Sequence, residues 1–245
     1  MENPLYIGLS RQVALRRQLD VVANNIANMN TVGFRADRML FETALEKAGR
    51  TRTEQVAFTI DRATYTDTRQ GGFAETGRAL DVAIQGDGWL GLDTPDGLRY
   101  TRDGRLNLAE DGLLVNVNGY AVLDDGGQPV QVPPDTGSID IAPDGTVTVD
   151  GEPLARIGVV RFDDQQAMER GADGLYATDE PAQPAPDALL AQGRIENANV
   201  QPIVEMSRMM ELSRDYQAVS RMVEEGHDLL RSAISRLGKA NTQGV

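Results

Sequence analysis

The two ends of the chain carry long amphipathic helical patterns, and this feature constrains the fold most strongly. Residues 4–29 follow Asn3-Pro4, a capping residue and a proline suited to the first helical turn. Residues 202–237 also begin with proline. At 1.5 Å per residue the two helices would be roughly 39 Å and 54 Å long. Apolar faces of that length need a covering surface, so the pattern predicts packing of the helices on each other or on neighbouring subunits.

The apolar residues of the first helix recur in steps of four and three, which is the spacing of a heptad seam. The predicted seam consists of Leu15, Leu19, Val22, Ile26 and Met29. Gly8 and Gln12 interrupt it on the N-terminal side. The last helix repeats the spacing, and its predicted seam consists of Met209, Leu212, Tyr216, Val219, Val223 and Leu230. We expect the two seams to pair, within a subunit or between neighbours, and to act as the assembly interface.

The middle of the chain has the pattern of short antiparallel strands. Asp-Gly and Asn-Gly pairs recur there, and such pairs favour hairpin turns because their residues tolerate positive φ. Between them lie short runs with strand character, such as Trp89–Leu92 and Tyr120–Leu123. The chain is therefore predicted to be an α+β protein, with terminal helices pairing as a coiled-coil-like layer and a central antiparallel β-domain of hairpin-connected strands.

These patterns divide the chain into four segments. Residues 1–35 form an N-terminal assembly helix with its signature, and residues 36–80 form an extended connector. A short helical piece is expected over residues 34–49, where the first segment passes into the second. Residues 81–190 form the acidic β-domain, and residues 191–245 form the C-terminal assembly helix. Three prolines between 181 and 186 predict a linker before that last segment.

Charge is concentrated in the middle. The chain has a net charge of −13, and residues 81–190 alone carry 21 acidic and 6 basic side chains, whereas the ends are nearly balanced. An acidic middle disfavours nucleic acid as a partner, because phosphate binding requires a basic surface. The absence of cysteine excludes disulfides, thiolate nucleophiles and cysteine-bound zinc. The N-terminus has no pattern of a cleaved signal peptide, and no run is apolar enough for membrane insertion.

The central carboxylates allow two chemical readings, a glycosidase acid–nucleophile pair and a calcium site. Asp-Gly turn chemistry on a solvated surface explains them more simply, and no EF-hand spacing is present. His227, which is the only histidine, lies in the middle of the last helix with no apparent catalytic partners. We therefore predict no catalytic residue, metal or cofactor. A polysaccharide-acting enzyme and a monomeric binding module with folded-back helices remain the alternatives.

Three stretches of the sequence resemble the bacterial flagellar basal-body rod family, in the family's order. The stretch 23–35 is similar to its N-terminal signature, whose residues here are Asn24, Asn25, Asn28, Asn30, Thr31, Gly33 and Phe34. Residues 80–89 and 100–104 are similar to its middle motif, and residues 196–200 and 209–216 to its C-terminal helix. Within the family, the size and the start of the last helix are most similar to proximal-rod members, with distal-rod members as the alternative.

The resemblance implies a non-enzymatic structural subunit of the axial drive shaft that crosses the periplasm. It implies export through the flagellar type III apparatus without a cleaved signal peptide, and assembly with copies of itself and with other rod proteins. It also implies that the terminal helices form the inner layer of a tube. From the unpaired apolar faces, we further expect the isolated chain to have frayed helix ends.

Overall fold

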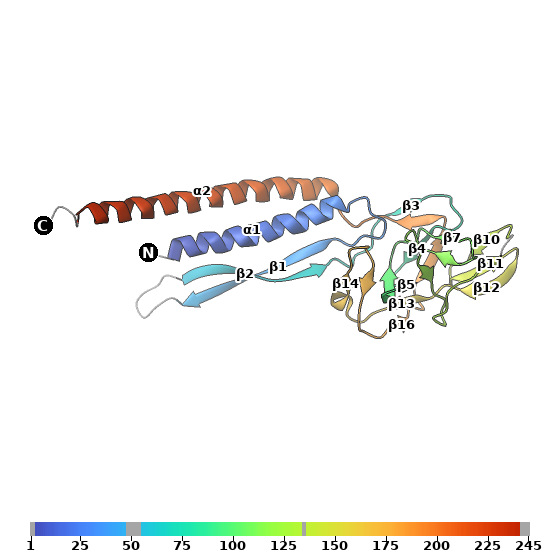
Figure 1. The fold of residues 1–245 in the computed structure, drawn as a ribbon. Coiled ribbons are helices and arrows are strands. Elements are labelled where there is room, and N and C mark those ends of the chain that lie inside the picture. Colours follow the sequence, from blue (N-terminus) through green and yellow to red (C-terminus); the bar gives the residue numbers. More distant parts are fainter. Residues whose placement is uncertain (1–2, 48–54, 134–135, 241–245) are drawn as a thin grey trace. The chain divides into compact units, whose positions relative to one another are not determined.

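The computed structural model describes residues 3–47, 55–133 and 136–240, and it shows an α+β chain with a helix near each end and an antiparallel β region between them (Figure 1). The chain divides into two compact units. The first unit comprises residues 1–27, 37–65 and 201–245, and the second comprises residues 28–36 and 66–200. Each unit has apolar clusters of its own.

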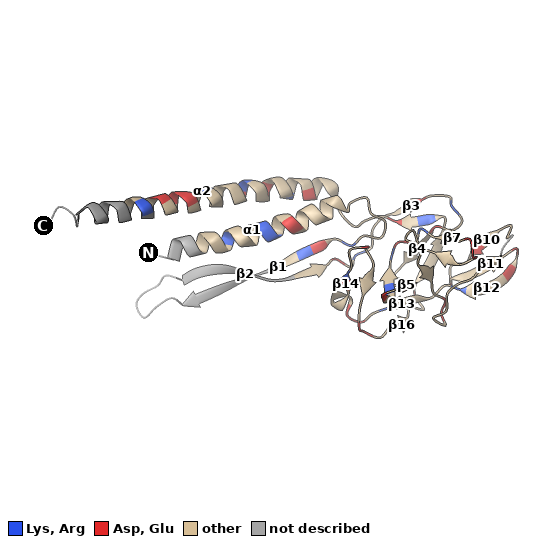
Figure 2. Ribbon diagram, viewed as in Figure 1, with Lys and Arg blue, Asp and Glu red and all other residues tan. Residues whose placement is uncertain are grey.

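The first unit contains two helices and two strands. Helix α1 spans Asn3–Ala27 and helix α2 spans Pro202–Ala240. The strands β1 (Asp37–Lys47) and β2 (Gln55–Thr66) pair in a two-stranded sheet. The two helices lie side by side (Figure 1), and residues of both contribute to one apolar cluster. Along the described parts of both helices, basic and acidic residues alternate with uncharged stretches (Figure 2), as expected from the nearly balanced charge of these segments.

The second unit is built from short strands, and the pairings among its described residues are antiparallel. Its largest sheet has nine strands, in which β14-β15-β6-β5-β9-β8-β7 follow one another while β13 pairs with β5 and β16. Their bounds are β5 (Trp89–Thr94), β6 (Gly97–Thr101), β7 (Asn107–Leu108), β8 (Leu114–Val115), β9 (Ala121–Val122), β13 (Val159–Arg161), β14 (Glu169–Arg170), β15 (Tyr176–Ala177) and β16 (Gln183–Pro184). A single turn of 3-10 helix, η1 (Gln165–Ala167), precedes β14.

Three smaller sheets complete this unit. The strands β10 (Ile139–Ile141), β11 (Thr146–Val149) and β12 (Glu152–Arg156) form a meander. The strand β17 (Leu189–Gln192) pairs with β4 (Val82–Gln85), and β18 (Arg194–Glu196) pairs with β3 (Phe73–Glu75). These last two pairs bring the chain before α2 back onto the beginning of the β region, so the unit is closed by segments more than 100 residues apart.

The β unit has an aliphatic and an aromatic cluster. The aliphatic cluster centres on fully buried side chains such as Ile84, Leu90 and Leu92. The aromatic cluster joins Trp89, Tyr100, Phe162, Met168 and Tyr176. The Trp89 and Tyr176 rings lie 4.7 Å apart between centroids. Trp89 is a core residue, because only 3% of it is exposed.

Two local predictions were wrong. A short helix was expected over 34–49, but Asp37–Lys47 is strand β1. Its residues have good helix propensity, yet pairing with the β-branched and aromatic-rich β2 satisfies its backbone as a strand, so tertiary pairing overrides the local preference. The proline-marked linker was also wrong, because β16 includes Pro184 and the following β17 completes a sheet. Pro184 lies in a two-residue strand, where a missing N–H costs little.

Candidate functional site

Most of the predicted seam residues meet in one cluster between α1 and α2. Leu15 and Val22 of α1 pack with Leu212 and Val219 of α2, and all four are less than 10% exposed. Four further seam residues are partly buried against this cluster, namely Leu19, Ile26, Tyr216 and Val223. The heptad spacing therefore located residues that pack together within one chain.

Three predicted seam residues lie elsewhere. Met29 follows α1 and packs, in the second unit, against a small cluster of Phe34, Ala36 and Val200. Met209 is 39% exposed. Leu230 lies outside the described side chains.

The interruptions of the seam are contact points rather than gaps. The amide nitrogen Nε2 of Gln12 donates to the Tyr216 hydroxyl at 3.2 Å and to the Ser220 hydroxyl at 3.0 Å. Gly8 lies so close to α2 that a methyl group placed on it would be 2.8 Å from a methyl carbon of Val223. The two positions that break the apolar pattern thus make direct contacts with α2.

An apolar patch on the first turns of α2 is exposed to solvent in the single chain. It consists of Ile203, Met206, Met209 and Met210, and their exposed fractions are 81%, 44%, 39% and 57%. Met209 and Met210 also line a groove between the helices, together with Leu19, Asp20, Ala23, Ser213 and Arg214. The lining of the groove comprises four apolar side chains, one serine, one acidic and one basic side chain.

The signature residue Asn25 fastens strand β1 to helix α1. Only 1% of Asn25 is exposed, and its amide makes two hydrogen bonds with the backbone of Asp37, one donated to the carbonyl and one accepted from the N–H, both at 2.9 Å. The next residue, Arg38, donates to the fully buried carboxylate of Glu205 in α2 at 2.7 Å. The beginning of β1 is therefore held by both helices through polar contacts.

The rest of the signature forms the turn that follows α1. Asn28 accepts hydrogen bonds from the backbone and the hydroxyl of Thr31, whereas Asn24 and Asn30 are exposed. Gly33 has φ of +70°, and its backbone packs against the peptide joining Arg102 and Asp103, so a Cβ would lie 2.6 Å from the Arg102 carbonyl carbon. Phe34 is buried beneath the guanidinium of Arg170, 4.4 Å from the ring centroid.

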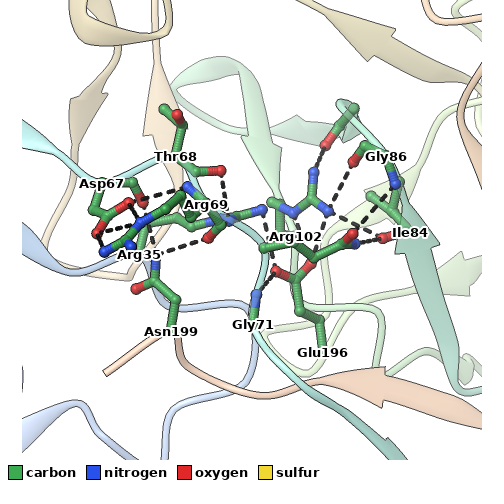
Figure 3. A network of polar contacts seen from close by, with 12 residues as sticks. Arg35, Asp67, Thr68, Arg69, Gly71, Ile84, Gly86, Arg102, Glu196 and Asn199 are labelled. Atoms are coloured by element: carbon green, nitrogen blue, oxygen red, sulfur yellow. Dashed lines mark hydrogen bonds and ion pairs between the residues drawn. The ribbon is translucent and has the colours of Figure 1, made fainter. Parts of the chain in front are cut away.

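A buried ionic network joins the three stretches that carry the family resemblance (Figure 3). Glu196, which is 1% exposed, forms ion pairs with Arg35 at 3.1 Å and with Arg102 at 2.8 Å. Its carboxylate also accepts the backbone N–H of Gly71 at 2.9 Å. Arg35 ends the N-terminal signature, Arg102 belongs to the middle motif and Glu196 begins the C-terminal motif. The fold therefore brings these three motifs to one point inside the second unit.

The two arginines are held mainly by backbone carbonyls. Arg102 donates to the carbonyls of Ile84, Gly86 and Gly88, and Arg35 donates to those of Thr68 and Arg69 (Figure 3). Burial lowers the pKa of the Arg35 guanidinium to about 10, and the neighbouring charge of Arg102 acts in the same direction. Two cations thus share one buried carboxylate, which makes Glu196 the electrostatic centre of the network.

The side-chain amide of Asn199 makes three further hydrogen bonds beside this network. Its oxygen accepts the N–H of Ala36 at 2.7 Å, and its nitrogen donates to the carbonyls of Asp67 and Arg69 at 2.7 and 2.8 Å. Four of these polar anchors were not assigned a role from the sequence: Arg35, Arg102, Glu196 and Asn199. The available signal was their position inside the resembling motifs, because a charged residue beside apolar neighbours in such a motif is a candidate for a buried pair.

The described residues show no arrangement suited to metal chemistry or membrane insertion. No group of three or more His, Cys, Asp or Glu side chains among them is placed to hold a metal ion. None of the helices in the described part of the chain is long and apolar enough to cross a membrane.

Comparison with known proteins gives full-length relatives. Three family models match: "Flagella basal body rod protein" at residues 5–35, "Flagellar hook protein FlgE/F/G D1 domain" at 83–149, and "Flagellar basal body rod FlgEFG protein C-terminal" at 191–236. The flagellar basal-body rod protein FlgF of Caulobacter vibrioides is 41% identical over 98% of this chain and 100% of its own length. FlgF of Rhizobium meliloti is 38% identical over 97% and 99%. FlgG of Bacillus subtilis is 32% identical over 96% and 99%.

Proposed function

This chain belongs to the flagellar basal-body rod proteins and is most like their FlgF members, and on that premise we propose that α1 and α2 pair as a coiled-coil-like layer through which it assembles into the rod. As a member of this family it is a structural subunit of the flagellar basal body and not an enzyme. The observation that supports the proposal is the division of apolar surface on the helices. One part is buried within the chain, and another, the α2 patch, is not.

The occupant of the groove beside the α2 patch is a helix of another rod subunit, either a copy of this chain or a related rod protein. A helix from such a subunit carries apolar faces and charges of both signs, as the helices of this chain do. Asp20 and Arg214 can then pair with opposite charges at the edges while Met209 and Met210 pack at the centre. Methionine side chains adapt to neighbours of different shape, which suits a rod built from more than one protein.

The proximal part of the rod is the proposed position. Three FlgF relatives match this chain at 37–41% identity and a fourth matches at 31%, whereas four FlgG relatives match at 27–32%. We also propose that the chain reaches the rod through the flagellar export apparatus without a cleaved signal peptide, as the resemblance of its N-terminus implies.

The test compares acidic substitutions in the seam, in the α2 patch and at a control position outside both. Leu19→Glu and Val223→Asp disturb packing within the chain, and Met210→Glu disturbs only the exposed groove. All three are expected to abolish incorporation into purified basal bodies and swimming, while Gln217→Glu, at an exposed position of α2, is expected to change neither. Trp89, the only tryptophan, reports by its fluorescence that the β unit stays folded. Normal incorporation of Met210→Glu would show that the groove is not a docking seat.

A further inference from the structure

The contact face between α1 and α2 has a polar position where the heptad pattern calls for an apolar one. Gln12 falls three residues before Leu15 in the seam, and its amide donates to both Tyr216 and Ser220. Gly8 occupies the preceding seam position, where a methyl group would lie 2.8 Å from a methyl carbon of Val223. These two positions differ in character from the aliphatic residues that follow them.

We propose that Gln12, with Gly8, determines the register in which α1 pairs with α2. Aliphatic seams specify register weakly, because Leu15, Leu19 and Val22 can pack against any similar row of residues. A partly buried amide is different, because a register that removes its acceptors leaves its N–H groups without partners. This inference concerns pairing within one chain, so it goes beyond the proposed docking of a second subunit and does not depend on it.

The residues around Tyr216 make the present register the favourable one. Moving α2 by one heptad in either direction would bring Val223 or Met209 to the place of Tyr216. The same shift would bring His227 or Ser213 to the place of Ser220, so each alternative pair offers one strong acceptor to the Gln12 amide, whereas Tyr216 and Ser220 present two hydroxyls four residues apart, on one face of the helix.

Gly8 adds a steric condition to this polar one. A methyl group on Gly8 would lie 2.8 Å from Val223 and 3.5 Å from the terminal carbon of Met222, so a larger side chain at this position would collide with α2. The notch at Gly8 and the amide at Gln12 are one helical turn apart. Together they mark a single axial position of α1 on α2.

The experiment measures the axial position of the two helices directly. The chain contains no cysteine, so one cysteine can be placed at each of the exposed positions Arg16 and Asp228 of the same chain and carry a spin label. Pulsed electron paramagnetic resonance then gives the distribution of the distance between the two labels. In the full-length parent chain we expect one narrow peak. In Gln12→Leu we expect a second population displaced along the helix axis by about 10 Å, the length of one heptad. The double variant Tyr216→Phe with Ser220→Ala, which removes both acceptors, should give the same second population.

The matched control is Gln217→Leu, which makes the same chemical change at an exposed position of α2 and should leave the parent peak unchanged. Circular dichroism confirms that each variant keeps its helices. A single unshifted peak in both Gln12→Leu and the double variant would overturn the proposal. So would a broad distribution in the parent chain, since a pair without a fixed register has nothing for Gln12 to determine.

Discussion

Glu196 is the residue on which most of the buried charge depends. It lies between Arg35 and Arg102, and both guanidiniums are almost fully buried. Removing one partner of a buried ion pair leaves an uncompensated charge, which costs far more than the loss of an exposed pair. At Glu196 a single substitution would leave two such charges.

We predict that Glu196→Gln lowers the free energy of unfolding of the β unit by about 3–5 kcal/mol. The control is Glu75→Gln, which breaks the exposed pair of Glu75 with Arg194 and should cost less than about 1 kcal/mol. Urea denaturation followed by Trp89 fluorescence measures both values. Equal effects of the two substitutions would mean that the buried network contributes no more than a surface ion pair.

Asn25 is the signature residue with the most direct structural role. Asn25→Ala removes both hydrogen bonds to the Asp37 backbone and leaves these groups to find other partners. We expect a loss of about 1–3 kcal/mol for the helical unit, from the cost of unsatisfied buried polar groups. Hydrogen exchange at the start of β1 measures it, and Asn30→Ala, at an exposed position in the turn after α1, is the control. Unchanged protection near Asp37 would argue against this role for Asn25.

At the scale of elements, the sequence predicted what local chemistry determines. The helix seam follows from spacing, and the strands between Asp-Gly and Asn-Gly pairs follow from turn preference, as at Gly97 between β5 and β6, where φ is +92°. Strand β1 was missed because its residues have good helix propensity, although it pairs with the next strand, β2. The pairings of β17 with β4 and of β18 with β3 were missed because the paired strands are more than 100 residues apart in the sequence. Glu196 and Asn199 were missed as anchors for the same reason.

The hairpin between β11 and β12 gives a prediction for acid stability. Asp150 accepts backbone N–H groups of Ser138 and Gly137, and these bonds hold the pKa of its carboxyl below the ordinary value of 3.8. Because the folded pKa is the lower one, this stabilisation is present above the ordinary pKa and is lost as pH falls through the folded value.

Asp150→Asn should therefore be less stable than the parent by a constant amount between pH 5 and 8, and the difference should shrink below about pH 4. Asparagine tolerates the positive φ of 50° at this position, so the backbone conformation is retained. Thermal unfolding across this pH range checks the prediction. A difference that persists unchanged at low pH would exclude the carboxylate as its source.

At the scale of the whole molecule, the surface that we propose for assembly differs from the surfaces that are buried on folding. The seam cluster and the β clusters are buried within the chain, whereas the α2 patch is exposed and adjoins the groove. We expect frayed helix ends in the isolated chain because part of the apolar surface of the helices can be covered only by a neighbouring subunit. The central claim is therefore that another rod subunit covers the α2 patch after assembly.

Methionine oxidation tests this claim most directly, because Met206, Met209 and Met210 all belong to the patch and Met168, which is 6% exposed, lies inside the β unit. The isolated chain and purified basal bodies are treated briefly with dilute hydrogen peroxide, and sulfoxide at each methionine is measured by mass spectrometry. We predict rapid oxidation of the three patch methionines in the isolated chain, strong protection of them in the assembled rod, and slow oxidation of Met168 in both. Equal reactivity of the patch methionines in the two samples would contradict the account.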